Sequence, residues 1–226
     1  DAACAETLAR GVLPAAARGN GQPVLVLPGF LGSDYFMQPL SDKIAAAGYT
    51  VYGWAQGVNT GTDAEKARAL GARLAEIAAK HPDEKVTLVG YSLGGVYARE
   101  LARIYPDKVS QVITLGAPFA LTDRKGAPDA VLTRSFNAFN GHAAGDTRMP
   151  PPVPTTSIFG TQDRIVNWRA SLNGQSALAE NIPVAAGHWS LTKDDRTAQI
   201  ILHRLALPAA GNWQPLAPRL CASAAP

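Results

Sequence analysis

Residues Gly90 to Gly94 read Gly-Tyr-Ser-Leu-Gly and lie between a β-branched run and a stretch with helical periodicity. A serine hydroxyl becomes a strong nucleophile when a neighbouring base takes its proton. On a sharp strand-to-helix turn Ser92 would stand above the end of the strand, and glycines two positions before and after it would let the crowded backbones approach. The pattern predicts a nucleophile at Ser92; the alternative is a serine that only caps the helix.

A serine nucleophile needs a base, and histidine is the side chain that most often supplies one. The chain contains four histidines. His81 precedes a proline at a predicted helix end, His203 lies in the last predicted helix, and His142 lies in a stretch without regular pattern. Only His188 follows a short apolar strand, residues 182–185, through a glycine. We therefore expect His188 to be the base, with a merely structural histidine as the alternative.

Short apolar runs alternate with helical patterns along most of the chain, which predicts parallel strands with helices on both faces of the sheet. The signature Thr62-Asp63-Ala64-Glu65 is a capping box that marks the start of one of these helices. The expected strands cover residues 23–28, 49–52, 85–89, 109–115, 156–159 and 182–185, and the expected helices cover residues 34–47, 62–80, 93–105 and 195–207.

The alternation lapses over residues 119–155, which we interpret as a small cap-like insertion. Residues 149–154 (Met-Pro-Pro-Pro-Val-Pro) predict a stiff extended strap. A short amphipathic helix is predicted by apolar and small residues at helical spacing, namely Val131, Leu132, Ser135, Phe136 and Phe139. Two interpretations stay open: a cap whose Phe136 and Phe139 face a bound acyl chain, or a helix packed permanently on the domain.

The composition predicts one globular domain over residues 1–226 with a Pro/Ala-rich tail over residues 208–226. The chain has 226 residues, of which 46% are hydrophobic and 17% charged, so disorder is excluded. The net charge is +3 and the basic residues are scattered, so we expect no nucleic-acid partner. No apolar run approaches the roughly 18 to 20 residues of a membrane span, so we expect no integral membrane segment.

The two cysteines, Cys4 and Cys221, lie near opposite ends of the chain and have no metal-ligand spacing. Either they form a disulfide that ties the two ends together, or they are two separate thiols. The sequence begins with Asp1 rather than Met, and its ends are rich in Ala and Pro. These features suit an exported protein, so we expect a secreted or periplasmic location.

Several segments together resemble one family. They are VLVLPGFLGS (24–33), VTLVGYSLGGVYAREL (86–101), VITLGAP (112–118), TTSIFGTQDRIV (155–166) and GHW (187–189). Over about residues 22–205 the chain resembles the α/β-hydrolase fold, and within it the small bacterial lipases and esterases. The resemblance implies a mostly parallel central sheet with helices on both faces and a small insertion before the strand that carries the acid. It also implies catalysis with no metal and no cofactor.

The family takes its nucleophile, acid and histidine in that order along the chain. The resemblance places the acid at Asp163, in the loop after the strand at 156–159, where it would fix the tautomer of His188. Asp123 is the rival, because some members of the family take the acid from the preceding strand. Asp194 and Asp195 suit N-caps of the last helix better.

The oxygen of a tetrahedral intermediate carries negative charge, which two backbone N–H groups should meet. By position these belong to Leu93 and, in the loop after the first core strand, to Phe30. The family often has His-Gly where this chain has Pro28-Gly29, so a plain turn is the alternative there. The aromatic residues Tyr91 and Trp189 are further candidates for the substrate pocket, and the alternative is that they belong to the core.

The sequence therefore predicts a serine-dependent carboxylic ester hydrolase of the lipase or esterase type, acting through an acyl-enzyme on Ser92. Its substrate would be a small-molecule or lipid ester. Polyester hydrolysis, or acyl transfer or thioester hydrolysis by the same three residues, stays open. So does a binding protein on an inactive hydrolase scaffold, although such a protein would have lost a catalytic residue and this chain has all three.

Overall fold

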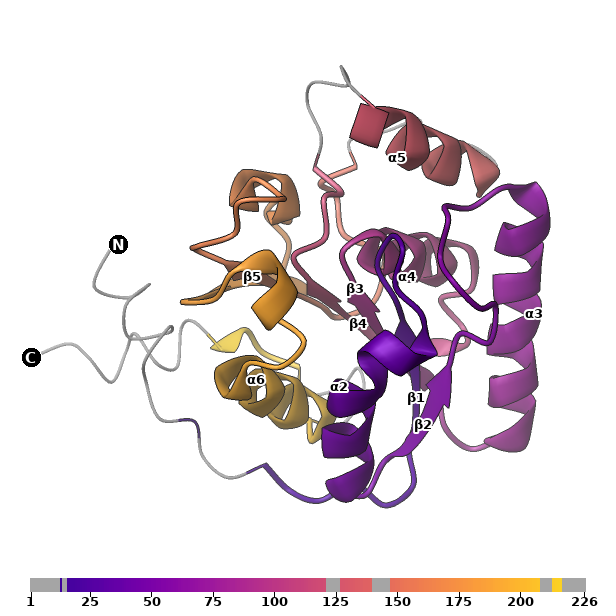
Figure 1. The fold of residues 1–226 in the computed structure, drawn as a ribbon. Coiled ribbons are helices and arrows are strands. Elements are labelled where there is room, and N and C mark those ends of the chain that lie inside the picture. Colours follow the sequence, from indigo (N-terminus) through magenta and orange to yellow (C-terminus); the bar gives the residue numbers. More distant parts are fainter. Residues whose placement is uncertain (1–12, 14–15, 121–126, 140–146, 208–212, 217–226) are drawn as a thin grey trace, which may run out of the picture.

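The computed structural model describes residues 13, 16–120, 127–139, 147–207 and 213–216. A six-stranded sheet in the order β2-β1-β3-β4-β5-β6 forms its centre, and every neighbouring pair of strands is parallel (Figure 1). The elements, in chain order, are β1 Pro23–Leu27, α2 Asp34–Ala46, β2 Thr50–Gly53, α3 Ala64–Lys80, β3 Val86–Tyr91, α4 Leu93–Ile104, β4 Val109–Leu115, α5 Ala127–Ala138, β5 Thr155–Gly160, the 3-10 turn η2 Trp168–Ser171, β6 Ala179–Val184, the 3-10 turn η3 His188–Ser190 and α6 Asp195–Leu205.

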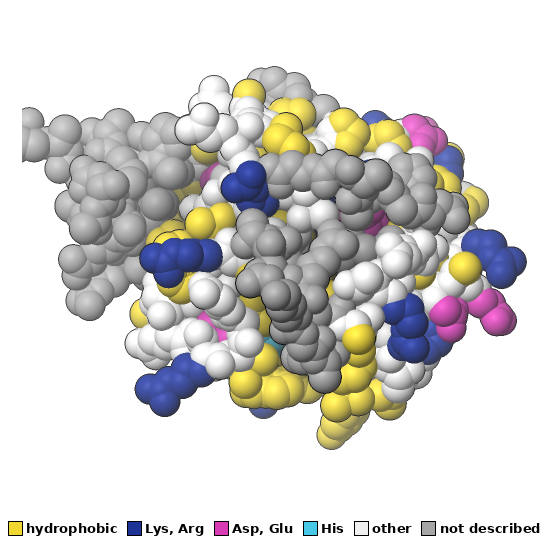
Figure 2. Space-filling view, turned by 90° about the horizontal axis from the view of Figure 1, so that it is seen from above, with side chains coloured by type: hydrophobic (Ala, Val, Ile, Leu, Met, Phe, Trp, Pro, Cys, Tyr) yellow, Lys and Arg dark blue, Asp and Glu magenta, His cyan; other side chains and the backbone are white. Residues whose placement is uncertain are grey.

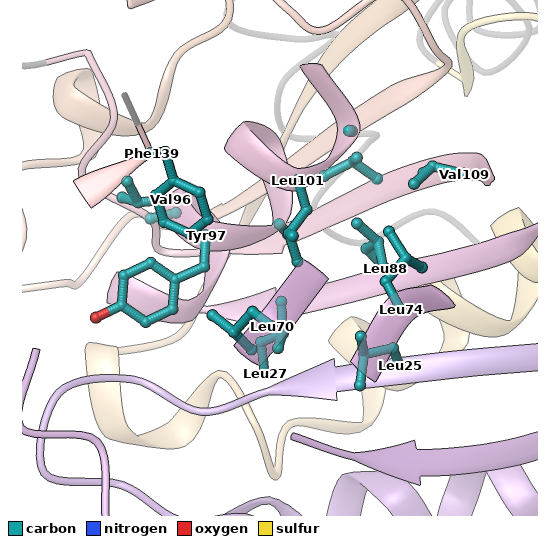
Figure 3. Close-up of a cluster of buried hydrophobic side chains, with 14 of the residues drawn as sticks. Leu25, Leu27, Leu70, Leu74, Leu88, Val96, Tyr97, Leu101, Val109 and Phe139 are labelled. Carbon is teal, nitrogen blue, oxygen red and sulfur yellow. The ribbon is translucent and has the colours of Figure 1, made fainter. Parts of the chain in front are cut away.

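Two apolar layers enclose the sheet, because alternate side chains of each strand point to opposite faces. In β1, Leu25 and Leu27 join the layer formed with α3 and α4, and Val24 and Val26 join the layer formed with α2 and α6. Figure 3 shows the first layer, in which leucines of β1 and β3 meet leucines of α3 and α4. The predicted parallel sheet with helices on both faces is thus confirmed.

The strand ends differ slightly from the sequence prediction where pairing extends them. β4 has the predicted bounds. β6 begins at Ala179 rather than at residue 182, because Ala179 to Val184 pair with Thr155 to Gly160 of β5. Pro183 is tolerated in β6 because this is an edge strand, where a missing N–H leaves no ladder partner unsatisfied.

The helices start near the capping residues predicted from the sequence, although the N-cap of α3 lies one residue later than predicted. Asp63, not Thr62, is the N-cap of α3, and its carboxylate accepts hydrogen bonds from the N–H groups of Glu65 and Lys66. The capping-box prediction therefore finds the right helix start but the wrong capping residue. Asp194 is the N-cap of α6, while Asp195 is its first helical residue.

The described part of the insertion is helix α5, which lies above α3 and α4 in Figure 1. Ser135 of α5 is fully buried and accepts a hydrogen bond from the N–H of Thr62 at 3.3 Å. Phe139, just after the helix, is 2% exposed, and its ring centroid lies 5.9 Å from that of Tyr97 in α4. Phe139 belongs to the buried core cluster, which fits a helix packed on the domain better than a side chain that faces an acyl chain. The side chain of Phe136 lies outside the described residues.

The last part of the insertion is held by the helix that follows Ser92. Arg99 of α4 is 1% exposed and donates hydrogen bonds to the carbonyls of Thr147 and Met149, at 3.1 and 2.9 Å. The strap that ends at Pro154 then joins the sheet through the N–H of Val112. The exit from the insertion is thus fastened to the same helix that begins at the nucleophile.

Within the described ranges no helix combines the length and apolar character that crossing a bilayer would need. Cys4, Cys221 and most of the 208–226 tail lie outside these ranges, so the disulfide stays a prediction.

Candidate active site

Ser92 occupies the turn between β3 and α4 with an unusual backbone conformation, φ 52° and ψ −121°. A non-glycine residue at positive φ is strained and persists only where the surroundings enforce it. Here the surroundings are close backbones: a Cβ on Gly90 would collide with the carbonyl oxygen of Gly94, and a Cβ on Gly94 with that of Leu27. The two glycines of the motif therefore let β1, β3 and α4 approach closely enough to hold the serine in this conformation.

Ser92, His188 and Asp163 form one hydrogen-bonded line. The Oγ atom of Ser92 lies 3.1 Å from Nε2 of His188, and Nδ1 of His188 lies 2.6 Å from Oδ2 of Asp163. The other carboxylate oxygen, Oδ1, accepts hydrogen bonds of 2.8 Å from the N–H groups of Ile165 and Val166. A carboxylate facing Nδ1 favours the proton on that nitrogen, which leaves Nε2 free to accept the serine proton.

The parallel sheet brings these residues together from distant parts of the chain. Ser92, Asp163 and His188 follow β3, β5 and β6 respectively, and in a parallel sheet all strands end at the same edge. The side chains of His188 and Asp163 are 4% and 1% exposed. Their interaction is therefore shielded from water, which strengthens it relative to a surface pair.

Tyr91, a candidate for the substrate pocket, is buried and supports the histidine. It is 2% exposed, its ring centroid lies 5.0 Å from that of His188, and its hydroxyl donates to the carbonyl of His188 at 3.2 Å. Burial, with a smaller contribution from the carboxylate of Asp163, raises the pKa of Tyr91 well above its ordinary value. The hydroxyl is thus a neutral donor at neutral pH.

Apolar side chains are exposed in several loops that follow strands at this edge of the sheet. Trp189 is 61% exposed, and its ring lies edge-on to His188 with 6.0 Å between centroids. Phe30, Leu31 and Tyr35, in the segment that follows β1, are also exposed. Figure 2 shows apolar side chains gathered at several places on the face that carries α5. Trp189 is therefore an exposed apolar side chain directly beside His188.

The loop after β1 packs directly against the nucleophile. A Cβ on Gly29 would lie 2.9 Å from Cβ of Ser92. In this loop the N–H groups of Leu31 and Gly32 are already used, by the carbonyls of Asn59 and Gly29. Within the part of the chain that the structure describes, no group accepts a hydrogen bond from the N–H of Phe30 or of Leu93.

Comparison with known proteins identifies the family to which the fold belongs. Residues 22–139, more than half of the chain, match the family described as the alpha/beta hydrolase fold. The chain belongs to the α/β-hydrolase fold family. No curated protein sequence matches it significantly.

Solved members of the fold resemble the chain at low sequence identity. A Bacillus licheniformis lipase, BlEst2, shares 17% identity with a TM-score of 0.65, and the match covers 87% of this chain and 96% of the lipase. A monoacylglycerol lipase of Paleococcus ferrophilus shares 17% identity with a TM-score of 0.59, covering 82% and 96%. A thioesterase domain from the curacin biosynthetic pathway shares 16% identity with a TM-score of 0.52, covering 84% and 93%.

The other candidates for the base and the acid are not found beside Ser92 among the described residues. His81 is the C-cap of α3, where its Nε2 lies 2.9 Å from the hydroxyl of Tyr52, and His203 lies within α6. His142 and Asp123, the rival acid, lie outside the described residues. The described residues contain no group of three or more His, Cys, Asp or Glu side chains that could hold a metal ion.

One residue next to the site, Asn59, was missed by the sequence analysis. It lies in the Asn-Thr-Gly segment after β2, whose composition indicates only a turn. Nothing in the sequence near Asn59 shows which distant loop it contacts, so no local signal could have identified it.

Proposed function

We propose that the protein is a serine-dependent carboxylic ester hydrolase that forms an acyl-enzyme on Ser92. The observation that carries the proposal is the continuous hydrogen-bonded line from Ser92 through His188 to the buried carboxylate of Asp163. A serine on a strained turn, a histidine within hydrogen-bond distance and an acid that orients the histidine together suit nucleophilic acyl chemistry.

In acylation, Oγ of Ser92 attacks the carbonyl carbon of the ester while its proton passes to Nε2 of His188. The imidazolium that forms is stabilised by the carboxylate of Asp163, 2.6 Å from Nδ1. When the tetrahedral intermediate collapses, the bond to the alcohol oxygen breaks and that oxygen takes the proton from Nε2. The alcohol leaves and the acyl group stays on Ser92.

Deacylation follows the same proton transfers, with water as the nucleophile. His188 takes a proton from the water, the resulting hydroxide adds to the acyl carbon, and the proton on Nε2 returns to Oγ of Ser92 as the acid leaves. The unused N–H groups of Phe30 and Leu93 would donate to the carbonyl oxygen in both intermediates. Leu93 is the first residue of α4, so the positive end of the helix dipole also faces this oxygen.

The exposed aromatic side chain of Trp189 and its apolar neighbours favour an ester with an apolar acyl or alcohol part. Lipids, small apolar esters and polyesters share that chemistry. Thioester hydrolysis or acyl transfer is the second candidate, because the same proton transfers serve it, and the fold is shared with a thioesterase domain.

The test is hydrolysis of p-nitrophenyl esters from acetate to palmitate, with the parent protein beside Ser92→Ala. Ser176→Ala is the matched control, because Ser176 is exposed in the loop that leads into β6, at the opposite edge of the sheet. We expect turnover in the parent and in Ser176→Ala and none in Ser92→Ala. Turnover of thioesters alone would favour the second candidate, and a folded parent that turns over neither would count against both and point to a narrow or non-ester substrate.

A further inference from the structure

Asn59 is fully buried and makes three hydrogen bonds to the loop that follows β1. Its N–H donates to the carbonyl of Gly32 at 2.7 Å, and its carbonyl accepts from the N–H of Leu31 at 2.7 Å. Its side-chain amide, through Nδ2, donates to the carbonyl of Pro28 at 2.8 Å. Asn59, which lies in the segment after β2, thus holds both ends of the Pro28–Gly32 turn.

The group held between these contacts is the N–H of Phe30. The Pro28 carbonyl lies on one side of the Gly29–Phe30 peptide and the Leu31 N–H on the other, and Asn59 bonds to both. Leu31 itself has φ 60°, a conformation that a leucine adopts only when it is enforced. The orientation of the Phe30 N–H therefore depends on contacts that Asn59 supplies.

The orientation of the Asn59 amide is itself fixed. Its Oδ1 atom accepts from the N–H of Gly61 and from the hydroxyl of Tyr97, each at 3.1 Å. Because two donors face Oδ1, the NH₂ group must face the Pro28 carbonyl, and the reversed amide would lose all three bonds. The Tyr97 hydroxyl also lies 3.5 Å from Oγ of Ser135, so the same amide is linked to helix α5 of the insertion.

We propose that Asn59 is a positioning residue that aims the Phe30 N–H at the oxygen of the tetrahedral intermediate. This inference rests on the proposed function, since it concerns the stabilisation of that intermediate. Asn59 does not touch the reacting atoms; it acts through the loop that carries the donor. A donor that is held in place before the reaction lowers the barrier more than one that must be reoriented during it.

The proposal predicts a specific kinetic signature. Asn59→Ala removes the hydrogen bond to the Pro28 carbonyl, so we expect kcat to fall about 10- to 100-fold. This is less than the roughly 100- to 1,000-fold loss that follows when an oxyanion donor is deleted outright, because the Phe30 N–H is still present. The KM should change by less than about threefold, because the carbonyl oxygen of the bound ester carries little charge. The affinity for phenylboronic acid should fall with kcat, because its adduct with Ser92 places an oxygen in the same position.

Two further variants separate positioning from general stability. Asn59→Ser introduces no charge into this fully buried position, and its side chain is too short to reach the Pro28 carbonyl, so it should reproduce the loss in kcat. It also serves if Asn59→Ala does not fold. The matched control is Tyr97→Phe: Oδ1 of Asn59 still accepts from the N–H of Gly61, so the amide keeps its orientation and all three bonds to the loop remain. Its melting temperature should fall, while its kcat stays within about threefold of the parent.

The outcomes are distinct. Folded Asn59 variants with parental kcat and boronate affinity would overturn the inference, and so would a Tyr97→Phe variant that loses as much kcat as Asn59→Ala. If the parent hydrolyses esters, Ser92→Ala does not, and the Asn59 variants match the parent, only this inference is lost. A parent without ester or thioester turnover would remove the proposed function and the inference together.

Discussion

Asp163→Asn is the substitution whose effect the geometry defines most sharply. Oδ1 of Asp163 accepts from the N–H groups of Ile165 and Val166, and Oδ2 faces Nδ1 of His188. An asparagine has one acceptor oxygen, and the two N–H groups hold that oxygen in place. Its NH₂ group must then face Nδ1, which forces the histidine proton onto Nε2. Ser92 would lose its base while every other contact stays.

The expected loss is large because the wrong tautomer blocks the first proton transfer. We expect kcat to fall by up to about four orders of magnitude, as for the same change in a serine-protease triad. That factor corresponds to about 5.4 kcal/mol in activation free energy. The fold should be kept, because both loop hydrogen bonds to Oδ1 survive.

The assay is kcat for a short p-nitrophenyl ester, with the urea midpoint measured on the same samples. Asp194→Asn is the control: it makes the same chemical change at the N-cap of α6, and asparagine caps helices as well as aspartate does. A variant Asp163→Asn with parental kcat, beside an inactive Asp123→Asn, would refute the assignment of the acid.

Three further predictions concern the framework. Gly94→Ala should lower the free energy of unfolding by about 3 kcal/mol or more, measured by urea denaturation, because its Cβ would overlap the Leu27 carbonyl; an unchanged midpoint would contradict the close approach. Arg204→Met should cost about 3–5 kcal/mol in the same experiment, because Glu180 would keep a buried carboxylate without the cation 2.8 Å away; replacing Glu180 by Leu as well should recover part of the loss. The N–H of Lys66 is the main cause that lowers the pKa of Asp63. This carboxylate therefore stabilises the fold above its ordinary pKa of 3.8, and the contribution is lost as the pH falls through the lowered value. The urea midpoint of Asp63→Asn should therefore depend less on pH than that of the parent below about pH 4, and parallel curves for the two proteins would contradict this prediction.

The order of strands and helices could be predicted because their signals are local. The apolar runs, the capping residues before α3 and α6 and the glycine spacing around Ser92 each act within a few residues of where they stand. Even so, the exact bounds of β6 depended on pairing with β5, and the N-cap of α3 moved by one residue. Ser92 and His188 could be predicted as nucleophile and base from such local signals, whereas the prediction of Asp163 as the acid depended on the family resemblance.

Side-chain surroundings could not be predicted in the same way. For Phe139 and Tyr91 the sequence left both a substrate pocket and the core open; in the structure one is packed on Tyr97 in the core and the other supports His188. An aromatic side chain has the same local pattern in a pocket wall and in a core. Which of the two it joins is decided by neighbours that lie far away in the chain.

The sequence by itself thus determined an alternating α/β chain with a strained serine turn and a histidine placed to act on it. Only the tertiary structure decided that Asn59 holds the loop of Phe30, that Arg99 fastens the end of the insertion, and that Asp163 reaches His188. The physical reason is distance along the chain. Capping, periodicity and turn chemistry are set by adjacent residues, whereas these contacts exist because a parallel sheet brings the ends of separate strands to one edge.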